Sequence, residues 1–338
     1  MRLAHVREQH AAAGAPYRLA AALGDGRGRW LDLEPARRRL VARQPGLAHN
    51  DGLFREPLTT LDAHLAAARR VADLAAIAGP FEVDPPAPDD DLSLEADELT
   101  FGPPILRPTS FRDFYAFETH VRAMWERRHD TIPEAWYRLP IFYFSNVSEL
   151  RGPLEPVWAP RGSAELDYEL EIGALIDSPA ANLAPEDAEA VIGGYFVLND
   201  WSARDLQRDE STVRLGPAKG KDFAVSIGPW LVTPDELADA REARGYALTG
   251  TVTVNGRECS RGSWAAIHHG FGDMLARASA DVRLRAGDIV GSGTIGGGSL
   301  LEVREATLGR FLEPGDRVTV EIERLGRLET PIVARPAA

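Results

Sequence analysis

An alternation of acidic and apolar residues at positions 165–172 is the segment of this sequence that points most directly to chemistry. The segment reads Glu165-Leu166-Asp167-Tyr168-Glu169-Leu170-Glu171-Ile172. In a strand, alternate side chains point to opposite faces, so four carboxyl groups would share one face. Neighbouring carboxylates repel one another unless a cation lies between them, and Mg2+, Ca2+ and Mn2+ all prefer oxygen ligands. The pattern predicts a cation site, and the alternative is a strand face that is merely solvated.

The placement of lysine singles out a second segment. The chain has 38 basic residues, and all of them except Lys219 and Lys221 are arginine. Both lysines lie in the segment 216–222, Gly-Pro-Ala-Lys-Gly-Lys-Asp. An ammonium group is compact and its pKa can be shifted, whereas a guanidinium cannot replace it in that role. At least one of the two lysines is therefore predicted to be required chemically, against the alternative of chance placement at the surface.

Two further groups of polar residues have spacings that suit a site. Asp113 and His120 fall on a helix expected over 111–128, and positions seven apart share nearly the same helical face. The alternative is that Asp113 starts the helix and His120 is an ordinary half-buried histidine. Asp200 ends an apolar strand, and Arg204 and Gln207 are three apart on the helix expected to follow it. The alternative there is a helix cap followed by an exposed helical face.

The glycine-rich segment 291–296 reads Gly-Ser-Gly-Thr-Ile-Gly after an expected strand. A dinucleotide-binding fingerprint needs a helix directly afterwards, because the helix N-terminus binds the phosphates. The sequence continues with more glycine and then a strand-like segment, so dinucleotide binding is rejected. The glycines are expected to form tight turns or to let the backbone approach a ligand.

Composition limits the class of protein. The chain has 338 residues, 44% of them hydrophobic, which is enough for one large domain and a smaller one. A formal net charge of -13 argues against a general nucleic-acid binder. Cys259 is the only cysteine, so an internal disulfide is impossible and a reducing, cytoplasmic location is expected. We expect no secretory signal and no association with a membrane, because apolar runs are short.

The elements that must position these residues are mainly short strands. We expect strands at 3–7, 17–23, 29–33, 141–144, 165–176, 191–199, 225–232, 249–254, 288–292, 300–303 and 317–323. We expect helices at 60–78, 111–128, 201–207 and 264–278, the first capped by Thr60 and ended by Gly79-Pro80. Strands do not alternate regularly with helices, so the predicted fold is mainly β with some α, as an antiparallel or mixed barrel or sandwich and not a doubly wound sheet.

A proline-rich acidic segment at 84–91 predicts a linker. We therefore expect a small β-rich N-terminal domain with its linker at residues 1–100. Residues 101–338 would form the larger, catalytic domain.

These motifs, taken in order, resemble the fumarylacetoacetate hydrolase superfamily, and most closely its two-domain bacterial members with a small N-terminal barrel. The resemblance covers about residues 105 to 330 and is weak over 1–100. It rests on Asp113-Phe114-Tyr115 with His120, on 142–146 (Phe-Tyr-Phe-Ser-Asn), 166–171 (Leu-Asp-Tyr-Glu-Leu-Glu), 199–207 (Asn-Asp-Trp-Ser-Ala-Arg-Asp-Leu-Gln), 215–221 (Leu-Gly-Pro-Ala-Lys-Gly-Lys) and 291–294 (Gly-Ser-Gly-Thr).

The resemblance implies a mixed β-roll core, a homodimer and a divalent cation, Mg2+ or Ca2+ with Mn2+ also possible. The implied metal ligands are Asp113, Glu169, Glu171 and Asp200. The implied catalytic residues are His120 as general base, Glu302 as the residue that orients it, and Lys221, Arg204 and Gln207 as stabilisers of negative charge. The implied contacts with the substrate are Tyr115, Tyr143, Arg204, Gln207 and Thr294.

The sequence departs from the family pattern in several places. Ala123 stands where smaller acylpyruvase-type members carry an acidic residue, so Glu302 in Ser299-Leu300-Leu301-Glu302 is assigned to orient His120. Ala224-Val225 lacks a threonine hydroxyl that the family can place near a second cation. Arg127 and Arg128 are both candidates for an arginine that lines the family pocket.

The activity that the resemblance implies is metal-dependent hydrolysis of a carbon–carbon bond in a 1,3-dicarbonyl compound, such as an acylpyruvate or a fumarylacetoacetate-like diketo acid. A hydratase, decarboxylase or tautomerase of 2-keto acids on the same metal-enolate site is the first alternative. A metal-binding member without turnover is the second. In each case the expected partner is a small diketo or keto acid, with no nucleic acid and no membrane.

Overall fold

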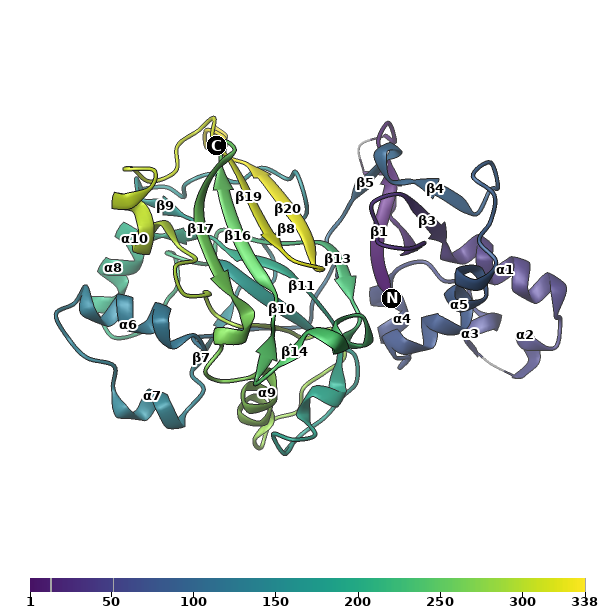
Figure 1. Ribbon diagram of the computed structural model, residues 1–338, viewed down its shortest axis with the longest axis horizontal. Helices are drawn as coiled ribbons and strands as arrows, with labels where there is room; N and C mark the ends of the chain where they lie inside the picture. Colours follow the sequence, from purple (N-terminus) through teal and green to yellow (C-terminus); the bar gives the residue numbers. More distant parts are fainter. Residues whose placement is uncertain (13, 51, 338) are drawn as a thin grey trace.

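The computed structural model describes residues 1–12, 14–50 and 52–337 (Figure 1). The strands in these residues are β1 (Arg2–Glu8), β2 (Arg18–Ala22), β3 (Arg29–Asp32), β4 (Ser93–Glu95), β5 (Leu99–Phe101), β6 (Phe111–Phe114), β7 (Phe142–Ser145), β8 (Leu150–Arg151), β9 (Leu166–Asp167), β10 (Leu170–Ile176), β11 (Ile192–Asp200), β12 (Ser202–Ala203), β13 (Val225–Val232), β14 (Arg241–Glu242), β15 (Gly245–Tyr246), β16 (Thr249–Val254), β17 (Arg257–Ser263), β18 (Ile289–Gly291), β19 (Arg317–Ile322) and β20 (Gly326–Pro331).

The α-helices in the same residues are fewer than the strands. They are α1 (Leu33–Arg43), α2 (Leu47–Asn50), α3 (Gly52–Arg55), α4 (Leu61–Ala66), α5 (Ala75–Val83), α6 (Glu118–Glu126), α7 (Glu134–Arg138), α8 (Arg204–Thr212), α9 (Phe271–Ser279) and α10 (Leu300–Val303). The prediction of a mainly β fold with some α, built on a mixed sheet, is confirmed. Within the described parts of the chain, no helix combines the length and apolar character that crossing a bilayer requires.

One large sheet runs through the molecule in the order β4-β3-β2-β1-β13-β11-β10-β18-β6-β7. Most neighbours are antiparallel, but β18 pairs with β6 in parallel, as β13 does with β8. The purple and blue N-terminal elements join the rest of the sheet through β1 and β13 (Figure 1). The sheet therefore continues from the first 101 residues into the rest of the chain.

A second sheet, ordered β17-β16-β19-β20, packs against one face of the large sheet. Its strand β16 reads Thr-Gly-Thr-Val-Thr-Val, and its alternate residues Val252 and Val254 are fully buried. They belong to the same core as Leu170, Ile172, Ala174 and Ile176 of β10. Apolar alternation on both sides of the interface explains why two layers form there.

The opposite face of the large sheet is covered in part by the N-terminal helices. Leu175 on β10 and Leu198 on β11 belong to a second core with residues of α1, α4 and α5. Every residue of β10 and β11 is therefore buried. Odd-numbered residues of β10 share the face of Leu175, so Glu171 is buried instead of solvated, and the solvated-face alternative is wrong.

Two expected elements are wrong in type. Residues 111–114 form strand β6, and helix α6 begins only at Glu118, because Phe111 and Phe114 are buried on opposite faces of the sheet. Asp113 and His120 therefore lie on a strand and a helix. Residues 300–303 form the short helix α10, not a strand, and they begin where two backbone N–H groups donate to Asp167.

Other expected elements differ in their bounds. The strand at 165–176 is divided into β9 and β10, whereas 225–232 and 249–254 are confirmed as β13 and β16. The helix at 60–78 begins as expected, with the N–H of Ala63 donating to Thr60 (3.1 Å), but it ends at Ala66. Pro80 lies inside α5 and does not end it, because Ile77 and Phe81 are held in the second core.

The segment 84–91 connects α5 to β4, and β4 pairs with β3. It thus joins two elements that both lie within the first 101 residues. Those residues contain helices α1–α5 as well as strands. The assignment of residues 1–100 as a separate domain stays a prediction.

Candidate active site

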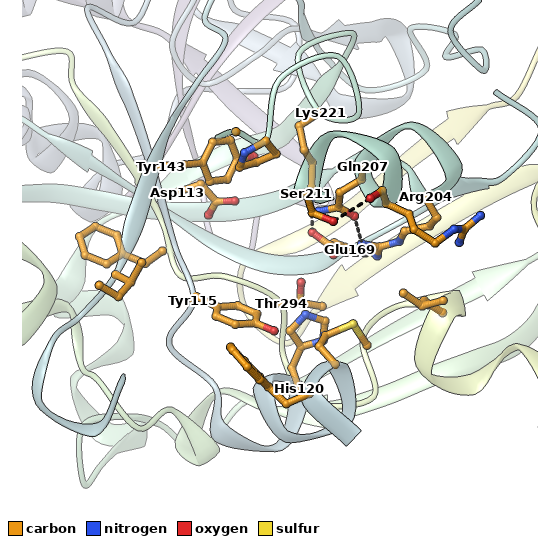
Figure 2. A pocket seen from close by; sticks show the side chains of 18 of the residues that line it. Asp113, Tyr115, His120, Tyr143, Glu169, Arg204, Gln207, Ser211, Lys221 and Thr294 are labelled. Carbon is orange, nitrogen blue, oxygen red and sulfur yellow. Dashed lines mark hydrogen bonds and ion pairs between the residues drawn. The ribbon is translucent and has the colours of Figure 1, made fainter. Parts of the chain in front are cut away.

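A pocket of about 580 Å³ opens at the end of the large sheet where β6, β10 and β11 bring their polar residues together (Figure 2). Most of the predicted site residues line it: Asp113, Tyr115, His120, Tyr143, Glu169, Glu171, Arg204, Gln207, Lys221 and Thr294. The remaining two, Asp200 and Glu302, lie directly behind this lining and bond to it. All of the predicted residues are therefore brought to one place.

Three buried carboxylates form a cluster at the inner wall of the pocket. Asp113 on β6, Glu171 on β10 and Asp200 on β11 each offer one oxygen, and these oxygens lie within 4.8 Å of one another. Strands β11 and β10 are adjacent in the sheet, and β18 lies between β10 and β6. Gly291 occupies that strand, and a Cβ built there would lie 2.3 Å from Asp113 Oδ1. Because Gly291 has no side chain, the three carboxylates have room to approach one another.

The electrostatics of this cluster fit a cation. Burial raises the pKa of Asp113 well above its ordinary value, and the charge of Asp200 raises it further. Burial and the charge of Asp113 do the same to the pKa of Glu171. Among the described residues, Asp113 Oδ1 and Asp200 Oδ1 are buried without a hydrogen-bond partner. Such oxygens are costly to bury unless something pairs with them, and a hard divalent cation has the required charge and ligand preference.

Glu169 lies in the same pocket, but both of its oxygens contact buried cations. Its Oε2 accepts from Lys221 Nζ (2.5 Å) and its Oε1 accepts from Arg204 Nη2 (2.7 Å). Burial alone would raise the pKa of Glu169, but Lys221 and Arg204 outweigh it and hold the pKa below its ordinary value. The assignment of Glu169 as a fourth metal ligand stays a prediction.

The two lysines have very different surroundings. Lys221 is buried, with 5% of its side chain exposed, and its Nζ also donates to Asp200 Oδ2 (2.5 Å). Burial would lower its pKa, but Asp200 and Glu169 outweigh burial and raise it, so the ammonium stays charged. Lys219 is 71% exposed and pairs with Asp222. Lys221 is thus the lysine that fits a chemical role.

Replacing Lys221 with arginine is expected to lower kcat by about tenfold or more, because a planar guanidinium cannot contact Glu169 and Asp200 from the same point. Lys219→Arg is the matched control and should keep the wild-type rate, since its ion pair lies at the surface. Steady-state kinetics of both variants on one substrate make the comparison. Equal rates for Lys221→Arg and wild type would contradict a chemical role for this lysine.

His120 on α6 and Glu302 on α10 form a buried pair. His120 Nδ1 lies 2.7 Å from Glu302 Oε2, and the carboxylate also accepts from Ser299 Oγ (2.9 Å) and the Gly297 N–H (2.9 Å). Burial would raise the pKa of Glu302, but His120 outweighs it and the pKa is lowered. An ionised Glu302 accepts the Nδ1 hydrogen, which leaves Nε2 of His120 as the basic nitrogen.

The remaining predicted residues surround these groups (Figure 2). Tyr143 donates to Asp200 Oδ2 (2.8 Å), and Thr294 donates to Glu171 Oε1 (3.3 Å). The ring of Tyr115 stands edge-on to His120 at 5.5 Å between centroids, and burial raises the pKa of its phenol. Gln207 accepts from Arg204 Nη1 (3.0 Å). Each therefore either steadies a charged group or presents a hydrogen-bonding group to the pocket.

The sequence analysis missed part of the pocket wall. Met124, Trp125, Phe142 and Leu301 also line it, and both candidate arginines, Arg127 and Arg128, lie at the same wall. Helical periodicity would have found Met124, four residues after His120 on α6. Ser299, three residues before Glu302, matches a sequence pattern for the start of a helix, which the strand expected there obscured.

Two curated relatives are about 30% identical to this chain over part of its length. The 2,4-didehydro-3-deoxy-L-rhamnonate hydrolase of Sphingomonas sp. (strain SKA58) is 29% identical over 187 residues, 55% of this chain and 62% of that protein. A mitochondrial oxaloacetate tautomerase of Xenopus laevis is 31% identical over 194 residues, 57% of this chain and 58% of that protein. The chain spans less than two thirds of the length of these relatives.

Solved structures resemble the whole chain. A maleylpyruvate hydrolase from Sphingobium sp. SYK-6, in complex with manganese(II) and pyruvate, has a TM-score of 0.64 at 22% identity and covers 99% of this chain and 100% of its own. This likeness shows the fold. The sequence profile described as "Fumarylacetoacetate (FAA) hydrolase C-terminal" matches residues 109–333, which include every residue of the site. The chain therefore belongs to the fumarylacetoacetate hydrolase family.

Proposed function

We propose that the protein is a divalent-metal-dependent hydrolase that cleaves a carbon–carbon bond in 1,3-dicarbonyl acids of the acylpyruvate or fumarylacetoacetate type. The observation that carries the proposal is the 2.7 Å contact of His120 with Glu302 in the pocket that also contains the carboxylate cluster. Hydrolysis needs a base that activates water, whereas decarboxylation on a metal-enolate site does not. An oriented histidine therefore favours the hydrolase over a decarboxylase, while a tautomerase would also use a base to move a proton on its substrate.

Asp113, Glu171 and Asp200 would hold the cation, Mg2+ or Ca2+ with Mn2+ also possible, and Glu169 is the predicted fourth ligand. A bound cation would supply Lewis-acid polarisation of the substrate's keto-enol oxygens. The substrate must then reach the buried carboxylates, which lie on the inner wall of the pocket. Its two keto-enol oxygens would then face the sheet, and its side chain would face the wall formed by Met124 and Trp125.

The residues of the chain would divide the work of hydrolysis. His120 Nε2 would take a proton from water, and the buried carboxylate of Glu302 would stabilise the resulting imidazolium. Lys221 and Arg204, with Gln207 beside them, would stabilise the negative charge that develops on the substrate. Tyr115, Tyr143 and Thr294 would orient the substrate in the pocket. A homodimer in the cytoplasm is proposed with this activity, on the family likeness and the single cysteine.

A tautomerase of 2-keto acids is the second candidate, because the Xenopus laevis relative is named an oxaloacetate tautomerase. Both reactions would share the cation and the charge-stabilising residues. They differ in the need for a hydrolytic water. Hydratase and decarboxylase activities on the same site, and a metal-binding protein without turnover, are further outcomes of the experiment below.

Incubation of protein loaded with Mg2+, Mn2+ or Ca2+ with acylpyruvates, oxaloacetate and 2-hydroxydienoates tests the proposal. We expect release of pyruvate and a carboxylic acid from an acylpyruvate, with loss of that activity in excess chelator. The products are identified by NMR and mass spectrometry. Faster interconversion of the tautomers of oxaloacetate would instead support the tautomerase. Faster release of CO2 from oxaloacetate would support the decarboxylase.

A further inference from the structure

Asp167 is a fully buried carboxylate that joins two parts of the site. It lies on β9, at the second acidic position of the alternating segment, and none of its surface is exposed. Its Oδ2 accepts from Arg204 Nε (2.7 Å) and from the Leu301 N–H (3.0 Å), and its Oδ1 accepts from the Leu300 N–H (2.7 Å). Asp167 does not line the pocket, so any effect on chemistry must pass through these partners.

One set of contacts fixes the helix that carries Glu302. Helix α10 has four residues, too few to hold its own orientation. The side chain of Ser299, the residue before it, makes no cap hydrogen bond, and its hydroxyl donates to Glu302. The first two backbone N–H groups of the helix donate to Asp167 instead. Asp167 thus takes the role of an N-cap side chain from a strand far away in the sequence.

The other contact fixes the guanidinium that lies across the pocket. Arg204 is buried, and it donates through Nε to Asp167, through Nη2 to Glu169 and through Nη1 to Gln207. Two points on the planar group are therefore held by buried carboxylates. Loss of the Nε contact would free the guanidinium to rotate about its remaining bonds.

We propose that Asp167 is a positioning residue that couples Arg204 to the His120–Glu302 pair. The Asp167 carboxylate sets the direction of the Arg204 guanidinium. Through α10 it also sets the position of Glu302, which orients His120. The kinetic part of this inference rests on the proposed function. The structural part, that Asp167 holds Glu302 against His120, does not.

The variant Asp167→Asn tests the coupling with little change in size. An amide has one acceptor oxygen, and its NH2 group would face either the Leu300 N–H or both Arg204 Nε and the Leu301 N–H. In either orientation one N–H group of α10 loses its acceptor. Asp316→Asn is the matched control, because Asp316 is also buried and also binds an arginine, Arg310, and a backbone N–H, that of Glu313.

The first measurement is the NMR signal of the His120 Nδ1 hydrogen in histidine-labelled protein, identified as the signal lost in Glu302→Gln. We expect Asp167→Asn to shift or broaden this signal and Asp316→Asn to leave it in place. The signal reports the His120–Glu302 contact whether or not the protein turns over any substrate tried. An unchanged signal in folded Asp167→Asn would overturn the proposal, even if the proposed activity is found.

The second measurement is steady-state kinetics on the best substrate. We expect Asp167→Asn to lower kcat by about 10- to 100-fold with KM changed much less, since the affected groups act in the transition state. Asp316→Asn should keep kcat within about twofold while it loses stability. If Asp167→Asn does not fold, Asp167→Glu carries the same test, because it keeps the charge but moves the carboxylate. An unchanged signal in Asp167→Glu would then overturn the proposal.

Discussion

The variant Glu171→Gln is expected to lose its bound divalent cation, with a fall in affinity of about 100-fold. Glu171 supplies one of three buried oxygens that lie within 4.8 Å of one another, and its neighbours Asp113 and Asp200 raise its pKa by their charge. A glutamine has the same size but removes a negative ligand atom, which a hard cation needs. Activity should fall with the metal content, and excess chelator should reproduce the loss in the wild-type protein.

Titration of metal-free protein with Mn2+ or Mg2+, followed by calorimetry, measures the affinity. Glu165→Gln is the control, because Glu165 belongs to the same alternating segment but pairs with Arg208 at the surface. Its affinity for metal should equal that of the wild type. Glu169→Gln should lower kcat more than metal affinity, because it removes a partner of Lys221 and Arg204. Wild-type affinity in Glu171→Gln would refute the cation site.

The variants His120→Ala and Glu302→Gln are each expected to slow acylpyruvate cleavage by about 100-fold or more while the metal stays bound. Alanine removes the base, and glutamine removes the negative charge that Nδ1 of His120 donates to. The two effects should not add, since both act on the same proton transfer. Kinetics of the two single variants and the double variant provide the measurement.

Two controls separate this effect from a general loss of structure. His268→Ala removes a half-buried histidine that does not line the pocket, and Glu305→Gln removes an exposed glutamate that pairs with Arg304. Both should keep the wild-type rate. A Glu302→Gln protein with the wild-type rate would show that cleavage does not depend on an oriented base, and it would contradict the role proposed for the His120–Glu302 pair.

The sequence predicted correctly those elements whose residue pattern is complete within one segment of the chain. The bounds of strands β13 and β16 agree with the sequence prediction to the residue, because the mainly apolar run of β13 and the alternation of β16 are each complete within one segment. The segment containing Asp113 was assigned to a helix because its polar residues fit a helical face. Its strand form depends on β18 and β7, which lie far away in the sequence. Helix α10 was missed for the same reason, since its first N–H groups are satisfied by Asp167.

The four acidic residues of the alternating segment show where the limit lies. The sequence alone determined that their side chains alternate with buried apolar ones, since that periodicity follows from backbone geometry, but it did not show that the segment is divided between β9 and β10. Only the tertiary structure decided what each carboxylate binds. Glu165 pairs with Arg208 at the surface, Asp167 binds Arg204 and α10, Glu169 binds Lys221, and Glu171 joins the carboxylate cluster. These partners come from segments that are distant in the chain, and their identity depends on long-range strand pairing, which no local pattern contains.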